Sequence, residues 1–228
     1  GGEYAYTWAT AHPAQVSCIY ADNPGSNRDV LMKLGELARE DVPLLHVCGS
    51  IDPLLGTNSA TIEAIYQQLG GRISVMIKEG AGHHPHSLRD PGPIADFIAR
   101  SVQEVPSEAP AFVVPRFTRT SYYGAESSYR DFPHEGTDIT CRGPLFTACY
   151  DRYVFSIPGV EGTITVIRPR TAAAGTPWVF RADHVRRDAT VDQALLARGF
   201  HIVTGPVPYN ADGPIRAHWD AVYRHLTD

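Results

Sequence analysis

The sequence has few cysteines, no long apolar run and no excess of positive charge. Four cysteines, at positions 18, 48, 141 and 149, are too few and too widely spaced for a disulfide-rich scaffold. No apolar stretch approaches the roughly 20 residues that a helix needs to cross a bilayer, so we expect no membrane partner. A formal net charge of -5 over 228 residues also argues against nucleic acid as the main partner.

The surroundings of the cysteines divide them into two pairs. Cys18 and Cys48 lie within apolar runs, and we expect both to be buried thiols. Cys141 and Cys149 flank a loop that contains proline, and their positions allow a disulfide if the protein is exported.

The sequence does contain the periodicity of an α/β protein. In residues 1–104, short apolar runs of the strand type alternate with segments whose apolar residues repeat every three or four positions. The expected strands are 16–21, 43–48 and 73–77, and the expected helices contain 4–9, 30–38, 62–69 and, after Asp90 as N-cap, 91–102. This alternation predicts an α/β fold, with a mostly parallel sheet and helices on both faces.

The rest of the chain has two parts. Residues 105–136 are rich in Pro, Ser, Glu and Tyr without periodicity, which predicts a linker or surface arm. Residues 137–228 regain periodicity. The expected elements there are meander strands at 153–157 and 163–168, strands at 177–181 and 200–204, a helix that ends at Gly199, and a final helix over 215–226.

The candidate catalytic residues come directly after two neighbouring strands of the first half. Asp52 comes three residues after Gly49, just past the strand 43–48, and His83 lies in Gly80-Ala81-Gly82-His83-His84, past the strand 73–77. Because the carboxyl ends of parallel strands meet at one edge of a sheet, the two side chains are expected to face each other there. A carboxylate that orients an imidazole general base is the pair that a serine nucleophile needs.

These two loops resemble the acid and histidine loops of the α/β-hydrolase family, in which the order is nucleophile, acid, histidine. The resemblance implies Asp52 as the acid and His83 as the base, with His84 as the alternative base. The opening segment Gly1-Gly2-Glu3-Tyr4-Ala5 resembles the segment just after the serine in Gly-x-Ser-x-Gly-Gly enzymes of this family. It implies a nucleophile just ahead of residue 1, outside this chain.

Residues 137–228 resemble the front half of the same family. The turn after the strand 177–181 would then supply a backbone N–H to the oxyanion hole, with Ala182 as the candidate donor. The order of the halves is rotated, and the strand that carries the serine is missing between 177–181 and 16–21. Two explanations fit: a fragment that spans two tandem units, which we favour because the missing strand is a central one, or a circular permutant opened at that strand.

The resemblance implies ester hydrolysis through an acyl-enzyme, on a small-molecule or carbohydrate ester or a peptide, with no cofactor. Two other functions use the same residues. A hydrolase fold without a serine would serve as a non-catalytic binding module. The run His83-His84-Pro85-His86 would suit zinc, but we expect adjacent histidine side chains to diverge, which disfavours a metal site.

Overall fold

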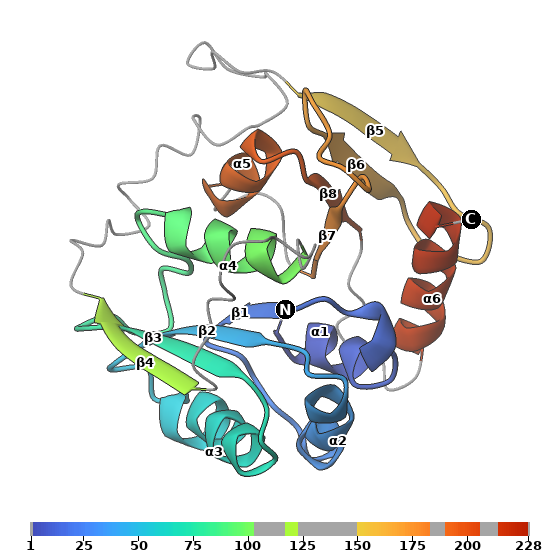
Figure 1. Ribbon diagram of the computed structural model, residues 1–228. Helices are drawn as coiled ribbons and strands as arrows, with labels where there is room; N and C mark the ends of the chain where they lie inside the picture. Colours follow the sequence, from blue (N-terminus) through green and yellow to red (C-terminus); the bar gives the residue numbers. More distant parts are fainter. Residues whose placement is uncertain (1, 103–116, 123–149, 183–189, 206–213, 228) are drawn as a thin grey trace, which may run out of the picture. The chain divides into compact units, whose positions relative to one another are not determined.

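The computed structural model describes residues 2–102, 117–122, 150–182, 190–205 and 214–227 (Figure 1). The chain divides into two compact units, Gly1–Tyr129 and Arg130–Asp228, and each is described by itself. The boundary between them falls inside the predicted linker 105–136. Cys141 and Cys149 lie outside the described residues.

The first unit is built on a four-stranded parallel sheet in the order β1-β2-β3-β4. Its strands are β1 (Ile19–Asp22), β2 (Leu44–Gly49), β3 (Ile73–Lys78) and β4 (Phe117–Tyr122). Its helices are α1 (Gly2–Ala9), α2 (Arg28–Arg39), α3 (Ala60–Gln68) and α4 (Gly92–Val102), with short turns η1 (Pro13–Gln15) and η2 (Leu55–Ser59). The predicted parallel sheet is therefore present in this unit.

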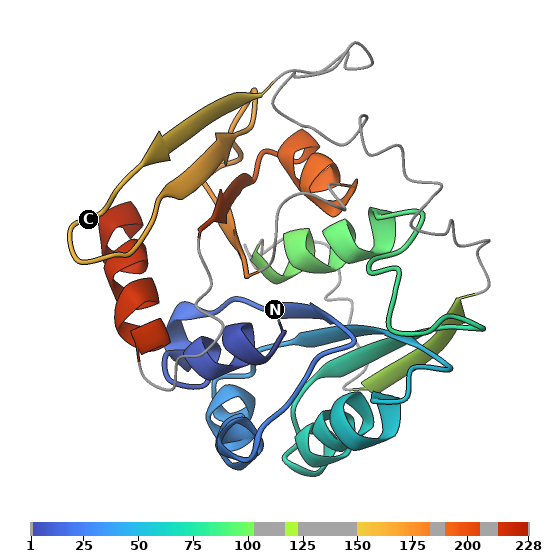
Figure 2. The same cartoon turned by 180° about the vertical axis from the view of Figure 1, so that it is seen from behind.

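Helices cover both faces of this sheet. Figures 1 and 2 show α1, α2 and α3 on one face and α4 on the other. All six residues of β2 are buried, as expected for the centre of a parallel sheet covered on both sides. The core on the three-helix face combines side chains from the helices and strands, among them Tyr6, Leu34, Leu37, Leu44, Ile62, Tyr66 and Ile73.

The ends of the helices follow from local sequence. Asn27 caps α2, because its Oδ1 accepts a hydrogen bond of 2.9 Å from Val30 N. Asp90 Oδ1 accepts from Gly92 N at 2.9 Å, so α4 begins at Gly92, one residue later than the pattern predicts. Gly70, with φ of 76°, follows α3 in the left-handed conformation that ends many helices.

Strand β4 is a difference from the sequence prediction. It pairs in parallel with β3, from Phe117 beside Ile73 to Tyr122 beside Lys78, within the segment predicted to be a linker. Its sequence FTRTSY has one apolar residue at each end and polar ones between. Such a segment has little apolar periodicity, and the backbone hydrogen bonds of a neighbouring strand are what make it a strand.

The second unit contains a mixed sheet in the order β5-β6-β8-β7. Its strands are β5 (Asp151–Phe155), β6 (Ile164–Arg168), β7 (Trp178–Arg181) and β8 (His201–Thr204). The β5–β6 and β6–β8 pairs are antiparallel and the β7–β8 pair is parallel. Helix α5 (Thr190–Ala197) contacts β8, and α6 (Pro214–Thr227) places Trp219 and Tyr223 against Phe180 and Trp178 of β7.

Strands β1 and β7 are the two strands between which the resemblance expects the missing strand. β1 is the first strand of the parallel sheet, and β7 is the last strand of the mixed sheet. In the described parts of the chain, β1 and β7 therefore belong to different sheets and do not pair with each other. No helix in these parts is both long and apolar enough to cross a membrane.

Candidate active site

Asp52 and His83 come from the loops that follow β2 and β3. His83 Nδ1 lies 2.9 Å from Asp52 Oδ2, within hydrogen-bonding distance as the sequence predicts. The two strands are parallel and adjacent, with Gly49 beside Lys78 at their carboxyl ends, so both loops leave the same edge of the sheet. Strand order thus brings the two loops to the same edge.

The two partners differ in exposure. The Asp52 side chain is 2% exposed, whereas that of His83 is 41% exposed. Asp52 Oδ1 accepts a second hydrogen bond, 2.9 Å long, from Leu54 N, so both carboxylate oxygens have partners despite their burial. Because a carboxylate only accepts, Nδ1 of a neutral His83 carries the proton and Nε2 keeps its lone pair.

Backbone hydrogen bonds join the acid loop to the histidine loop. Ser50 N donates to Lys78 O, and Ile51 N donates to Ala81 O, both at 3.0 Å. Gly80 N donates to Ser50 Oγ at 2.8 Å. The relative position of the two loops is therefore fixed by the main chain as well as by the Asp52–His83 bond.

Gly49 permits this close approach at the end of β2. A Cβ atom at this position would lie 2.0 Å from Gly82 O and 2.3 Å from Ala81 O. No side chain fits there unless the backbone of the histidine loop moves away.

Three polar residues at the strand tips anchor the histidine loop at every second residue. Asn23 Nδ2 donates to His83 O at 2.8 Å, Lys78 Nζ donates to Pro85 O, and Asp22 Oδ1 accepts from Ser87 N at 2.7 Å. Lys78 is fully buried and Asn23 nearly so, and Asn23 Oδ1 also accepts from Gly49 N at 2.9 Å. These side chains hold the loop in place through its backbone.

The sequence pattern does not assign these anchors. In the sequence, Asp22 and Asn23 belong to the turn Asp22-Asn23-Pro24-Gly25, and Lys78 is the residue after an apolar strand. The sequence does show that each of these polar residues comes at the end of an apolar strand, at the same sheet edge as Asp52. It does not show which groups they bind, because all three bind backbone groups of a loop that is distant in the sequence.

No protein-family model, curated protein or solved structure matches this chain. A function for it therefore rests on the geometry and chemistry of its own residues.

The remaining predicted site residues lie as follows. His84 is exposed, and its ring centroid is 5.0 Å from that of His83, but the hydrogen bond of Asp52 goes to His83. Of the two candidates, His83 is therefore the one that Asp52 orients. Ala182 is half-buried and follows β7 in the second unit.

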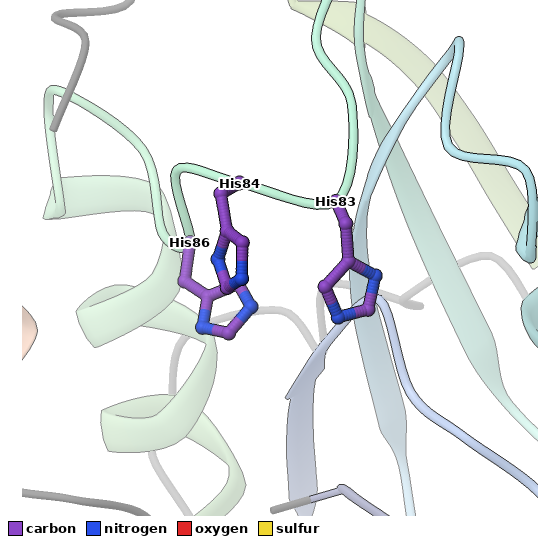
Figure 3. Close-up of side chains that lie close together, drawn as sticks. All are labelled: His83, His84 and His86. Carbon is purple, nitrogen blue, oxygen red and sulfur yellow. The ribbon is translucent and has the colours of Figure 1, made fainter.

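The side chains of the histidine run converge, whereas the sequence predicts that adjacent ones diverge. His83, His84 and His86 each offer one ligand atom, and these atoms lie within 4.8 Å of one another (Figure 3). The expectation that the adjacent side chains of His83 and His84 diverge is therefore wrong. The turn of the loop at Pro85 brings His86 beside both, with centroids 5.6 Å from His83 and 4.5 Å from His84.

A further histidine of the first unit lies in the core. His46 in β2 is fully buried, and its Nε2 is 2.6 Å from the hydroxyl of Tyr6 in α1. Burial lowers the pKa of His46 to about 3 and raises that of Tyr6, so both groups are neutral at pH 7. Their role is structural.

The first unit contains two cysteines, Cys18 and Cys48, whose thiols are poor nucleophiles. Cys18 is half-buried and Cys48 buried, and both are free, so the prediction of burial holds fully only for Cys48. Burial raises the pKa of Cys48 to about 11, an effect that a hydrogen bond with Ser59 opposes in part. A thiol with such a pKa holds its proton at neutral pH and is a poor nucleophile.

Proposed function

We propose that Asp52 and His83 are the acid and base of an ester hydrolase of the serine type. His83 Nε2 takes the proton of a serine hydroxyl as the serine oxygen attacks the ester carbonyl carbon. The imidazolium then gives that proton to the leaving alkoxide, and water repeats both steps to release the acid. Asp52 holds the Nδ1–H tautomer and stabilises the imidazolium.

The observation that carries the proposal is the 2.9 Å contact between a buried carboxylate and an accessible imidazole. A purely structural Asp–His pair does not need a buried carboxylate, 2% exposed, beside an imidazole that is 41% exposed. A general base needs this difference in exposure, because Nε2 of its imidazole has to reach the substrate while the carboxylate holds Nδ1.

The nucleophile in this proposal is a serine that the chain does not contain. Among the described serines, those nearest in sequence to the pair have other hydrogen-bond partners: Ser50 Oγ accepts from Gly80 N, and Ser87 Oγ donates to Leu88 O. Neither hydrogen-bonds to His83. We therefore expect the 228-residue chain alone to form no acyl-serine by this route.

Two features of the described residues agree with the resemblance to α/β-hydrolases. The resemblance expects a further strand beside β1 and beside β7, and among the described strands each of these two lies at the edge of its own sheet. The same resemblance expects tight packing at the start of α1, and a Cβ on Gly2 would lie 3.0 Å from Pro24 Cα. Esters of small molecules or carbohydrates are the proposed substrates, without a cofactor.

The test is serine labelling of the product of the full natural reading frame. A fluorophosphonate probe is expected to label a serine within Gly-x-Ser-x-Gly just ahead of the residue numbered Gly1 here, and ester turnover is expected to vanish in His83→Ala. His12→Ala, a histidine outside the site, is the matched control and should keep full activity. Another residue at the serine position would indicate a binding module, and turnover that survives His83→Ala would overturn the proposal.

A further inference from the structure

We propose that His83, His84 and His86 form a binding site for a single transition-metal cation of the zinc type. All three lie in the loop between β3 and α4, and one nitrogen of each lies within 4.8 Å of the others. Figure 3 shows the three rings gathered on the same side of this loop, with a nitrogen of His83 directed toward the other two rings.

The spacing is close to that of an occupied site. An ion at the centre of a triangle with sides of at most 4.8 Å is at most about 2.8 Å from each corner, and a Zn–N bond is about 2.0–2.1 Å. Each nitrogen therefore has to move inward by no more than roughly 0.7 Å to bind the ion. His84 is exposed and His83 is 41% exposed, so two of the three rings are not locked by packing.

The hydrogen bond between Asp52 and His83 fits a metal ligand. A histidine that binds a metal usually donates its other ring N–H to a carboxylate or carbonyl, which fixes the tautomer and raises the basicity of the ligating nitrogen. Asp52 accepts this bond from Nδ1 of His83, 2.9 Å away, and leaves Nε2 to bind the ion. The histidine run is thus accompanied by a carboxylate that orients one of its rings.

The loop that carries the ligands is already ordered by its anchors. The backbone of the loop is bound at His83 O by Asn23, at Pro85 O by Lys78 and at Ser87 N by Asp22. These three contacts lie on either side of His84 and of His86 in the sequence. Binding to such a loop costs little conformational entropy. Among the side chains shown to bind this loop, the carboxylates of Asp22 and Asp52 outnumber the ammonium group of the buried Lys78, which favours a cation.

The donor set selects the class of metal. Three imidazoles suit Zn²⁺, Co²⁺, Ni²⁺ or Cu²⁺, whereas Mg²⁺ and Ca²⁺ require oxygen ligands. Three protein ligands also leave one tetrahedral position open for water. The metal and the proposed general-base chemistry both need the lone pair of His83 Nε2, so a bound ion would inhibit the proposed hydrolysis.

The test is metal titration of the 228-residue protein in neutral buffer. Zn²⁺ is followed by calorimetry and Co²⁺ by its visible absorption, and we expect one ion per chain with the intense bands of tetrahedral cobalt. Asp52→Asn is expected to weaken binding about 10–100-fold, as for other carboxylates that orient a metal-binding histidine. His84→Ala and His86→Ala are expected to weaken it more, and His12→Ala not at all.

Because the His84 side chain is exposed, His84→Ala should fold normally, and circular dichroism verifies this. A His84→Ala protein that binds Zn²⁺ as tightly as the wild type, or a wild type without a stoichiometric tetrahedral ion, would overturn the metal site. Neither result bears on the hydrolase proposal, which is decided by serine labelling and needs no metal. Conversely, failure to label a serine leaves the metal site intact.

Discussion

At the scale of single residues, the difference in exposure between Asp52 and His83 determines what the pair can do. A buried carboxylate with both oxygens bonded cannot rotate freely, so it directs one nitrogen of the imidazole and leaves the other accessible. Either a serine proton or a metal ion can use that second nitrogen. The orientation therefore matters to both proposals.

The first prediction concerns the tautomer of His83. In Asp52→Ala the acceptor for Nδ1–H is lost, and we expect the neutral ring to shift toward the Nε2–H form. Long-range ¹H–¹⁵N spectra at alkaline pH distinguish the two tautomers. His201 in the second unit serves as an internal control, and an unchanged His83 tautomer would show that Asp52 does not orient the ring.

The second prediction concerns acid stability and His46. The pKa of this buried ring falls from an ordinary 6.5 to about 3, so between these values the unfolded chain binds more protons than the folded one. Stability therefore decreases as the pH falls through this window, by about 2 kcal/mol between pH 8 and pH 5 from His46 alone.

His46→Gln removes the titration and keeps an acceptor for the Tyr6 hydroxyl. Denaturant unfolding at the same two pH values should show a smaller loss of stability in this variant than in the wild type. His225→Gln, at an exposed position, is the matched control. Equal losses in wild type and His46→Gln would contradict a neutral, buried His46.

At the scale of secondary-structure elements, the site depends on how three strand tips hold one loop. Parallel strands bring their carboxyl ends to one edge, but the distance between loops is set by side chains and glycines at those ends. Asn23 after β1 and Gly49 at the end of β2 are the two positions that the structure singles out.

The third prediction separates the backbone and side-chain roles of Asn23. Its φ of 39° is in the left-handed region, and its side chain bonds both His83 O and Gly49 N. Asn23→Gly keeps the conformation but loses both bonds, and we expect a loss of about 1–3 kcal/mol in unfolding free energy. Asn23→Ala adds backbone strain and should lose more, so equal stability in all three proteins would refute this role.

The fourth prediction concerns the contact of Gly49 with the histidine loop. In Gly49→Ala the new methyl group would overlap Ala81 O and Gly82 O, and the loop must shift to relieve the overlap. We expect lower stability and displaced NMR signals for His83 and His84. Gly56→Ala, where a methyl group would meet nothing within 4 Å, is the matched control and should leave these signals in place.

At the scale of the whole molecule, the described residues of the acid and histidine loops and their anchors all belong to the first unit. The core that supports them, from Tyr6 in α1 to Ile77 in β3, also lies within that unit. Ala182 alone among the predicted site residues belongs to the second unit.

The fifth prediction follows from this division. Residues 1–129 expressed alone should fold cooperatively, and the histidine signals of the site should match those of the full chain. The measurement is denaturant unfolding together with NMR of the truncated protein. An unfolded fragment would show that the second unit is needed to complete the core of the first.

The sequence by itself determined most of the strands and helices and the Asp52–His83 pair, because these follow from local apolar periodicity and from the rule that parallel strand ends share an edge. The tertiary structure alone decided the edge strand β4, the three anchors of the histidine loop and the convergence of His83, His84 and His86. Each of these depends on contacts between residues distant in sequence, or on the path of a loop without periodicity. The local sequence pattern does not predict such contacts. A polar residue at the end of a strand gives the same pattern whether its side chain binds water or the backbone of another loop.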